Sequence, residues 1–514
     1  KRLGRPIKTF YDRRDTFYNL SQDADCHTSF KVGFNNDGTI TAVKIDNICA
    51  KMGQYGIDHF EENTRIPNLA LNYLEAQINV APAYWFRCEQ NHNALCLSLV
   101  FEHVAAELGM DPTIVALKND GVEGKDMEYL SKFKKEHGFP DRDSLRECIE
   151  LGKKAIDWDN KWHKPGTKVL PNGKLHGIGF TWTHEWDDTR GVACAGVLMH
   201  CDGTVDILSQ KSDDGLNAMT THCQIVAEEM GLKLEDVNFR MFEEVGFQMM
   251  TPDGSCNLAV DAYVTRNAAR KAKQKLLEYA TTPIKLIDIE YPPAFPNNYP
   301  DDLDVKDSIV FLKSDPSKNV PVAEVVKRAT LNQGGTRAPL FTWSWHRQGR
   351  YGTEKGRHRM CRQAYFAEVE VDPGTGGVEV KKIVNVNDVG KAISPETCEG
   401  QQYGGDYMGT GRALAEEVIY DPKTGVRLNA NLLDYKVWTM RDIDTTVNLL
   451  VETGMGYGAY GLNGIGECIA TVVPGVIGAA IYNAIGEWVD DHPMTPDKVL
   501  KAISKAKAKR GGLR

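Results

Sequence analysis

The sequence predicts a mixed α/β (α+β) protein of several lobes, and three observations lead to this prediction. The chain has 514 residues, of which 42% are hydrophobic and 25% are charged, and these proportions are typical of a globular protein. At roughly 100–200 residues per domain, this length allows three or four lobes. Stretches with strand-like alternation and stretches with helical periodicity follow one another along the chain, which favours sheets covered by helices.

Strand patterns occupy three regions. Residues 7–48 alternate in the manner of strands, with a turn at 35–38. Residues 177–209 are strand-like around the hairpin signal Asp202-Gly203, and strands are expected again over 364–386. Because Asn, Asp and Gly at such positions are typical of tight turns, the first two regions are predicted to contain hairpins.

Helical periodicity is found over residues 91–109, 120–165, 216–231, 257–280, 402–416 and 468–487. The last of these is strongly apolar, but Pro474, Gly475 and Asn483 interrupt it. A membrane span needs about 18 or more consecutive apolar residues, so a buried helix is predicted and no membrane contact. Residues 282–360 are rich first in Pro, Asp and Asn and later in Arg, Gly and Trp. This composition predicts a long irregular excursion.

The overall composition excludes several functional classes. The net charge of −9 argues against a nucleic-acid surface, which needs clustered Lys and Arg. None of the twelve cysteines is spaced as C-x-x-C, so zinc or iron–sulfur ligation within this chain is not expected. Their scatter favours reduced thiols over a disulfide framework, and residues 1–6 show no apolar signal segment. These features predict a cytoplasmic protein.

The strongest functional signal is a short loop of small or polar residues that opens directly into a helix. It occurs at residues 86–91, 212–215, 251–256 and 461–467. A helix N-terminus has unpaired N–H groups and a partial positive charge, and it therefore attracts anions. Small residues let the backbone approach a ligand closely. Each loop alone is better explained as an ordinary cap, turn or surface ion pair, but together the loops predict a site for one bulky anionic cofactor.

Two further signals lie near the C-terminus. Glu467 follows a glycine-rich turn and precedes an apolar helix, and apolar surroundings raise a carboxyl pKa toward the range of a general base. The alternative is a Glu that only favours the first helical turn. Residues 456–461 match G-x-G-x-x-G, but a second glycine loop intervenes before the helix. A dinucleotide site is therefore only a minor alternative.

Several motifs in order resemble the molybdenum hydroxylases, and in particular the molybdopterin-binding large subunit of the xanthine oxidase and aldehyde oxidase family. The motifs are found at residues 4–13, 83–87, 102, 117–119, 177–181, 387–390, 400–401, 431–436 and 464–467. They extend over nearly the whole chain. The resemblance implies α/β lobes around a buried cofactor, with residues 1–125 as a first molybdopterin-binding domain and residues 126–514 as a second. The N-terminal part of the first domain is missing or belongs to another chain.

The resemblance also implies a role for individual residues. Glu467 would be the catalytic base that accepts a proton at the metal centre. The cofactor contacts would come from Arg87, Cys88, Asp214, Gly215, Gly254, Ser255, Cys256, Gln401 and Gly466. The substrate pocket would contain Phe180, Thr181, Glu89, Tyr55 and His184. The protein would not ligate the metal directly, because the pterin holds it.

The implied activity is the oxidation of a small organic substrate, an aldehyde or an activated C–H group, with oxygen from water. Electrons would pass to iron–sulfur and FAD sites on partner subunits, since neither site is recognisable in this chain. A further partner would carry the missing N-terminal part. The resemblance leaves open whether the pterin carries a nucleotide and whether tungsten replaces molybdenum.

Three departures from the family pattern leave alternatives open. The chain starts after the first cofactor loop of the family. The second loop has Asp214 where a glutamine is usual, and Glu89 and Tyr55 stand where a purine-binding enzyme has an aromatic residue and an arginine. A purine substrate is therefore not expected. A redox-neutral hydratase that adds water to a C=C bond, a cofactor-free scaffold subunit, and a flavin or nicotinamide dehydrogenase are the alternatives.

Overall fold

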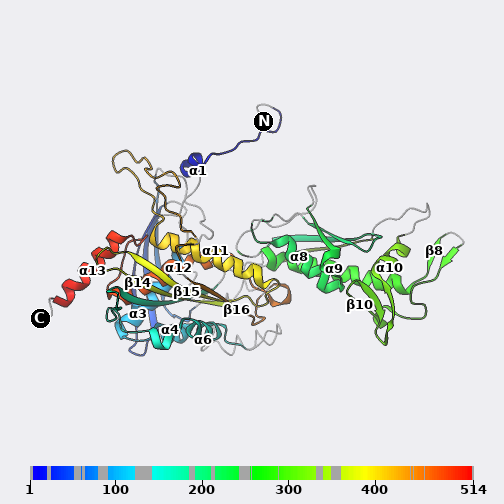
Figure 1. Cartoon of the computed structure of the whole chain (residues 1–514), viewed down its shortest axis with the longest axis horizontal. Helices are drawn as coiled ribbons and strands as arrows, with labels where there is room; N and C mark the ends of the chain where they lie inside the picture. The colour runs from blue at the N-terminus through cyan, green and yellow to red at the C-terminus, as the bar shows by residue number, and fades with distance from the viewer. Residues whose placement is uncertain are drawn as a thin grey trace.

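The computed structural model arranges the chain as two groups of sheets and helices (Figure 1). We name residues 25–184 and 361–511 the central lobe and residues 191–348 the distal lobe. The structure describes residues 4–19, 25–50, 60, 64–78, 91–121, 142–184, 191–209, 213, 215–241, 255, 257–286, 289–330, 340–348, 361–439, 441–443, 445–456 and 458–511. The mixed α/β fold predicted from the sequence is confirmed.

The central lobe is built on a four-stranded sheet in the order β16-β15-β14-β4. Its strands are β4 (Leu175–His184), β14 (Arg362–Val371), β15 (Val378–Asp388) and β16 (Thr446–Val451). β14 pairs antiparallel with β4 and β15, whereas β15 and β16 are parallel. Helix α12 (Ile469–Ile485) packs on β4 and β14, and α11 (Pro395–Leu414) packs on α12. Helix α6 (Ser144–Ile156) packs against β14 and β15.

Two glycines of β4 allow α12 to lie directly on the sheet. A Cβ atom at Gly177 would lie 2.0 Å from the oxygen of Ala480, and one at Gly179 would lie 2.4 Å from its nitrogen. Alternate strand residues point to opposite faces, so Phe180 faces the other side, where it packs with Phe366. Helices thus cover both faces of β4, which explains its nearly continuous burial.

The remaining elements of the central lobe include a smaller sheet in the order β1-β2-β3. Its strands are β1 (Cys26–Phe34), β2 (Ile40–Ala50) and β3 (Leu69–Ala76), and the other helices are α3 (Asn91–Leu108), α4 (Pro112–Asn119), α7 (Trp158–Lys161) and α13 (Pro496–Gly511). The predicted hairpin at 35–38 is confirmed, because the Asn35 N–H donates to the Thr39 oxygen at 2.9 Å.

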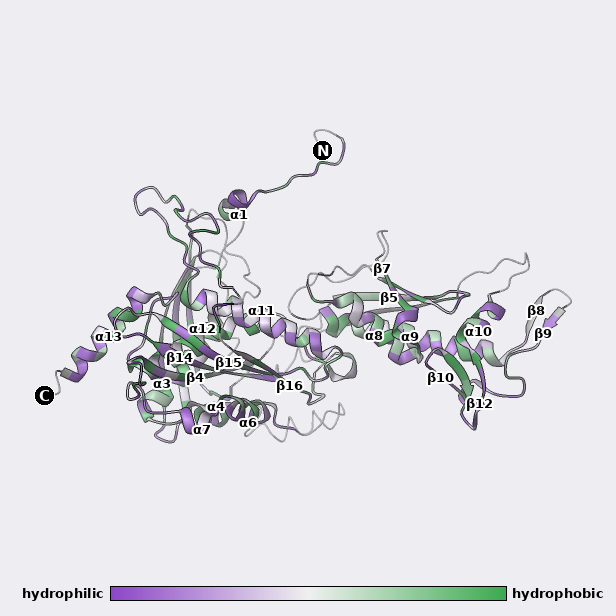
Figure 2. Ribbon diagram, viewed as in Figure 1, coloured by the Kyte–Doolittle hydropathy of each residue, from purple (hydrophilic) through white to green (hydrophobic). Residues whose placement is uncertain are grey.

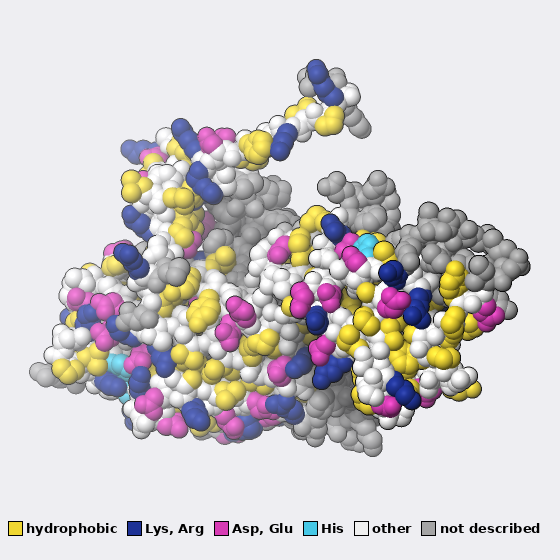
Figure 3. All heavy atoms as spheres, turned by 45° about the vertical axis from the view of Figure 1, so that its right-hand side comes forward, with side chains coloured by type: hydrophobic (Ala, Val, Ile, Leu, Met, Phe, Trp, Pro, Cys, Tyr) yellow, Lys and Arg dark blue, Asp and Glu magenta, His cyan; other side chains and the backbone are white. Residues whose placement is uncertain are grey.

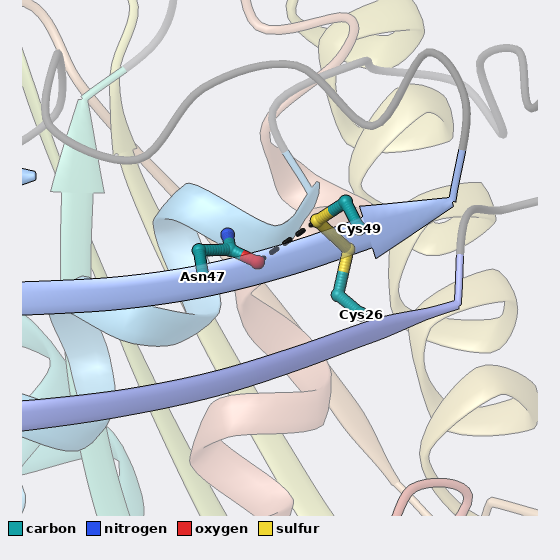
Figure 4. The surroundings of a disulfide bond; sticks show 3 residues. All are labelled: Cys26, Asn47 and Cys49. Carbon is teal, nitrogen blue, oxygen red and sulfur yellow. Dashed lines mark hydrogen bonds between the residues drawn. A yellow bond between two sulfur atoms is a disulfide. The ribbon is translucent and has the colours of Figure 1, made fainter. Parts of the chain in front are cut away.

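Two predictions for the N-terminal region were wrong. Residues Arg13–Asn19 form a short helix, α1, instead of a strand. The carboxylate of Asp12 accepts a hydrogen bond from the Asp15 N–H at 2.7 Å and caps the first turn. Cys26 and Cys49 form a disulfide and are not both reduced (Figure 4). Antiparallel pairing of β1 and β2 places the two cysteines directly opposite each other, with their Cα atoms 4.2 Å apart.

The distal lobe contains a four-stranded sheet in the order β13-β5-β6-β7. The strands are β5 (Gly191–Met199), β6 (Val205–Ser209), β7 (Val237–Met241) and β13 (Leu340–Gln348). Helix α9 (Asn257–Thr281) packs against β5 and β13, and α8 (Ala218–Met230) packs against α9. Buried alanines at 268, 269 and 272 let α9 approach its neighbours closely.

The predicted irregular excursion over residues 282–360 was wrong for its described part. These residues form β8 (Ile284–Leu286), β9 (Ile289–Tyr291), β10 (Leu303–Lys306), β11 (Ile309–Leu312), β12 (Asp315–Pro321) and α10 (Val322–Ala329), followed by β13. The strands are short and are separated by turns, so the Pro, Asp and Asn residues of the turns dominate the composition of the segment.

Charged side chains of both signs lie on the surface of the described residues. Cationic and anionic side chains are interspersed on the face drawn in Figure 3. Helix α13 becomes largely hydrophilic toward the C-terminus (Figure 2), although Val499 and Ile503 on its inner side are buried. Within the described ranges, no helix is both long enough and apolar enough to cross a bilayer.

Candidate functional site

Two of the four predicted loops meet where the lobes join, near the first turns of α9 and α12. Ser255 lies just before α9 and has a φ of 52°, which is unusual for a residue other than glycine. Its Oγ accepts a hydrogen bond from the Glu467 N–H at 2.9 Å. Glu467 is half-buried and lies just before α12. The structure therefore brings the predicted base and a predicted cofactor residue together, although they are far apart in the sequence.

The two glycines before Glu467 make this contact possible. A Cβ atom at Gly464 would lie 2.1 Å from the Ser255 carbonyl oxygen. A Cβ atom at Gly466 would lie 3.2 Å from Ser255 Oγ. Any side chain at 464 would force the two loops apart, so glycine is required there by the close approach of the backbones.

A second pair of predicted residues is also in contact across the same junction. The Gln401 Nε2 amide on α11 donates a hydrogen bond to the Gly215 carbonyl oxygen at 3.2 Å. Gly215 has a φ of 86°, and its turn is held by Asp213, whose carboxylate accepts bonds from the N–H groups of Gly215 and Asn217. In Figure 1, α8, α9 and α11 meet at this junction between the lobes.

The loop that carries Glu467 is anchored in the core by Asp388, a residue to which the sequence analysis assigned no role. This buried carboxylate, at the end of β15, accepts hydrogen bonds from the hydroxyls of Ser144 (2.7 Å) and Thr453 (2.6 Å). Burial raises its pKa, and these hydrogen bonds oppose that effect. Two residues further on, a Cβ atom at Gly390 would lie 1.9 Å from the Gly461 oxygen. A polar residue that ends an apolar strand was the available sequence signal.

Asn257 is a further candidate that the sequence analysis did not identify. It is the first residue of α9 and is only 8% exposed. Within the described part of the chain, neither polar atom of its side chain has a hydrogen-bond partner. A buried amide without a partner costs free energy, and such a group commonly marks a ligand or water position. The sequence signal that could have identified it is its position directly after the predicted cofactor residues Ser255 and Cys256.

The described members of the predicted substrate pocket lie in the core of the central lobe. Phe180 is 1% exposed and packs between Trp158 and Phe366, with ring centroids 6.4 and 5.0 Å away. The Thr181 hydroxyl donates to Ser98 of α3, and His184 is buried at the end of β4. Their assignment to the substrate pocket remains a prediction.

The other predicted site residues lie outside the described residues, and they remain predictions. They are Tyr55, Arg87, Cys88, Glu89, Asp214, Gly254 and Cys256. The described site thus consists of the contact between Ser255 and Glu467, the contact between Gln401 and Gly215, and the buried amide of Asn257.

Two family models, both described as molybdopterin cofactor-binding domain, match residues 1–120 and 148–444. The xanthine dehydrogenase molybdenum-binding subunit of Escherichia coli O157:H7 is 26% identical over 527 residues, which cover 98% of this chain and 65% of that protein. The nicotine 6-hydroxylase large subunit of Paenarthrobacter nicotinovorans is 27% identical over 98% of this chain and 62% of its own length. The chain thus spans less than two thirds of these relatives.

Solved structures show the same fold. Quinoline 2-oxidoreductase from Pseudomonas putida 86 superposes with a TM-score of 0.79 at 19% identity, over 98% of this chain and 65% of that chain. Aldehyde oxidoreductase from Desulfovibrio gigas gives a TM-score of 0.72 at 17% identity, over 96% of this chain and 51% of that chain. At these identities the similarity establishes the fold alone. The family models, which match more than half of the chain, show that it belongs to the molybdopterin cofactor-binding family.

Proposed function

We propose that this member of the molybdopterin cofactor-binding family is the catalytic part of a molybdenum hydroxylase, with Glu467 as its general base. The observation that supports the proposal most strongly is the hydrogen bond from the Glu467 N–H to Ser255. It joins the predicted base to a predicted cofactor loop across the two lobes. The two residues are 212 positions apart in the sequence, and both were predicted to belong to the site before their contact was known.

The described residues at the junction fit an anionic pterin group. The N-terminus of α9 offers backbone N–H groups, and the buried amide of Asn257 offers a donor and an acceptor that have no described partner. We propose that Ser255, Asn257, Gln401 and Gly466 hold the group, together with Gly215 and with the predicted residues outside the described ranges. When bound, the metal–pterin group accepts two electrons from the substrate.

Glu467 would supply the proton transfer. Its N–H is fixed by Ser255, and the close backbone contact at Gly464 restricts how the loop can move. We propose that the Glu467 carboxylate accepts the proton that is released when water provides oxygen to the substrate. The buried core behind it, formed by Ile465, Cys468 and Ile469, excludes water from that side.

The partner and substrate proposals come from the sequence pattern and from the names of relatives. Relatives are called molybdenum-binding, large or gamma subunits, which supports a multi-subunit enzyme. The proposal that its partners are iron–sulfur and FAD subunits comes from the resemblance found in the sequence. We propose a cytoplasmic location. Glu89 and Tyr55 favour an aldehyde or another activated C–H substrate over a purine. Analysis of the pterin and the metal in the purified complex determines whether the pterin carries a nucleotide and whether the metal is molybdenum or tungsten.

The test is Glu467→Gln in the purified holoenzyme complex. Turnover of benzaldehyde, quinoline and xanthine is measured with an artificial electron acceptor, beside metal and pterin content. Removal of a general base lowers turnover by about 10²–10⁴-fold, and we expect cofactor content to stay unchanged. Glu396→Gln, at the exposed first turn of α11, is the matched control and should retain full turnover.

Two outcomes would redirect the proposal. Near-wild-type turnover of Glu467→Gln would remove Glu467 from the catalytic role. Product formed from an unsaturated substrate under anaerobic conditions without any acceptor would identify the hydratase alternative. That alternative is motivated by Asp214 and Glu89, which both depart from the family pattern.

A further inference from the structure

A cluster of charged and aromatic side chains joins the Glu467 loop to the distal lobe, away from the cofactor residues. We name residues 454–467 the strap. Tyr460 lies on the strap within the short helix η3 (Ala459–Gly461) and has a φ of 64°. Its hydroxyl donates to Glu229 Oε1 at 2.5 Å, and Glu229 is on α8. The strap is therefore tied to the distal lobe by one short hydrogen bond to a carboxylate.

Two arginines of α9 complete the cluster. The Arg270 Nε group donates to Glu229 Oε2 at 2.7 Å. The Arg266 guanidinium lies between the rings of Tyr263 and Tyr460, 4.9 and 5.0 Å from their centroids. Burial acts to raise the pKa of Glu229, but the hydrogen bonds from Arg270 and Tyr460 outweigh it and hold this pKa below its usual value. Glu229 is thus ionised near neutral pH and accepts strongly.

Backbone hydrogen bonds hold the strap on both sides of Tyr460. The N–H groups of Gly456 and Gly458 donate to the oxygens of Gly461 and Leu462 at 2.9 and 3.0 Å, and the Asn463 N–H donates to Val389 at 2.8 Å. A displacement at Tyr460 would therefore be transmitted along the backbone. Ala459 and Leu462 also pack against Ala259 of α9, close to the Ser255 turn.

The backbone conformation of Tyr460 is a second indication that its side chain has a specific role. A bulky residue with positive φ is strained by about 1–3 kcal/mol, and such strain persists where the surrounding structure fixes it. Glycine would adopt this turn without strain. Both parts of the Tyr460 side chain are engaged, since the ring contacts Arg266 and the hydroxyl donates to Glu229.

We infer that Tyr460, Glu229 and Arg266 form a clamp that fixes the strap against α8 and α9 and so positions Glu467 beside Ser255. Tyr460 is a positioning residue, because it acts through Glu467. The inference rests on the proposed function of Glu467. It adds a determinant that lies outside the cofactor loops and belongs to the interface between the lobes.

The experiment compares Tyr460→Phe and Glu229→Gln with the control Tyr279→Phe in the full holoenzyme. Tyr279 is also on α9 but is partly buried against the core of the distal lobe. Hydrogen–deuterium exchange is followed for peptides within 461–468, beside metal content and steady-state kinetics. We expect exchange in these peptides to rise by roughly three- to tenfold in both clamp variants. We expect kcat to fall by about tenfold with KM within about twofold, since a misplacement of about 1 Å costs up to 10²-fold. Metal content and the control should not change.

Each result decides the inference. If exchange at 461–468 is unchanged in both clamp variants, the clamp does not hold the strap and the inference is wrong. Faster exchange with unchanged kcat would also contradict the inference, because the strap would then move without any effect on catalysis. If Glu229→Gln or Tyr460→Phe fails to fold, the other variant carries the test. The Glu467→Gln measurement separates the two proposals: if it retains turnover, the proposed function fails, whereas if it is inactive and Tyr460→Phe is normal, only the clamp fails. If the wild-type enzyme converts none of the tested substrates, the hydrogen–deuterium exchange of residues 461–468 is the only test of the clamp.

Discussion

The contact between β4 and α12 and the contact between the strap and α9 both depend on glycine, but they use it differently. In the central lobe, Gly177 and Gly179 let a buried helix lie on a buried strand. At the junction between the lobes, Gly464 lets one irregular loop touch another, and individual hydrogen bonds then hold Ser255 and Glu467. The first contact is part of the core and stabilises the fold. The second contributes little to stability but orients groups, so substitutions in the two regions should separate stability from activity.

The largest effect is expected for Gly179→Val. Its Cβ atom would lie 2.4 Å from the Ala480 nitrogen and 2.5 Å from the Val476 oxygen, and these are backbone atoms of a helix that cannot move locally. Overpacking of this kind typically costs about 1–3 kcal/mol and occasionally more, and we expect the upper end or beyond. Urea unfolding of the full chain, followed by tryptophan fluorescence, measures the loss. A wild-type midpoint would mean that α12 does not rest on β4.

The next effect concerns a polar network in the central lobe. Burial alone would raise the pKa of Glu368, but hydrogen bonds from His176 (3.1 Å) and Lys161 (2.7 Å) outweigh it and lower this pKa to about 2. The side chain of Glu368 is 14% exposed. Because the pKa is depressed in the folded state, the stabilisation is fully present above the usual pKa of about 4.5 and is lost as the pH falls toward 2.

We therefore expect Glu368→Gln to lower the free energy of unfolding at pH 7 by about 1–3 kcal/mol. The variant should also lose part of the decline in stability that the wild type shows between about pH 5 and 2. Unfolding midpoints at several pH values measure both effects, with Glu396→Gln as the control. If the curves of the wild type and Glu368→Gln are parallel down to pH 2, the network does not contribute in this way.

The same contrast explains what could be predicted from the sequence. The helix expected over 257–280 is α9 (Asn257–Thr281), and the helix expected over 468–487 is α12 (Ile469–Ile485). Their boundaries were close because apolar periodicity and flanking turns are local signals. The helix expected at 402–416 begins earlier, at Pro395. Its first turns are polar and largely exposed, so they have no apolar periodicity that could have predicted them.

The site was less accessible to sequence reasoning, because its contacts are long-range. The glycine loops and Glu467 could be identified as candidates, but nothing local to Ser255 indicates that its hydroxyl accepts the Glu467 N–H. Asp388 and Asn257 were missed, because a buried carboxylate and a buried amide are recognised only when their surroundings are known. The disulfide between Cys26 and Cys49 was missed because strand register, and not spacing, brings the two cysteines together.

Ser255→Ala tests the junction with a smaller expected effect on stability. Alanine removes Oγ and keeps the strained φ of 52°. The loss of one hydrogen bond should cost about 0.5–1.5 kcal/mol, too little to unfold the lobe, while metal and pterin content falls measurably. Ser255→Gly relieves the strain and also lacks Oγ. If both variants retain full cofactor content, the hydroxyl does not take part in holding the cofactor.

The smallest change in the free energy of unfolding is expected for Gly400→Ala, and this substitution should stabilise the protein instead of destabilising it. Gly400 lies inside α11, its backbone is not in the left-handed region, and a Cβ atom there would meet no other atom within 4 Å. Alanine is better than glycine in an exposed helix by about 0.5–1 kcal/mol, so the variant should unfold at a slightly higher denaturant concentration. The neighbouring Gln401 keeps its hydrogen bond to Gly215, and cofactor content should not change. A gain in stability combined with a loss of cofactor would mean that glycine is needed at position 400 for a close approach of the ligand. Helix α11 would then resemble the strap, where glycine serves the site, and not the core, where glycine serves the packing.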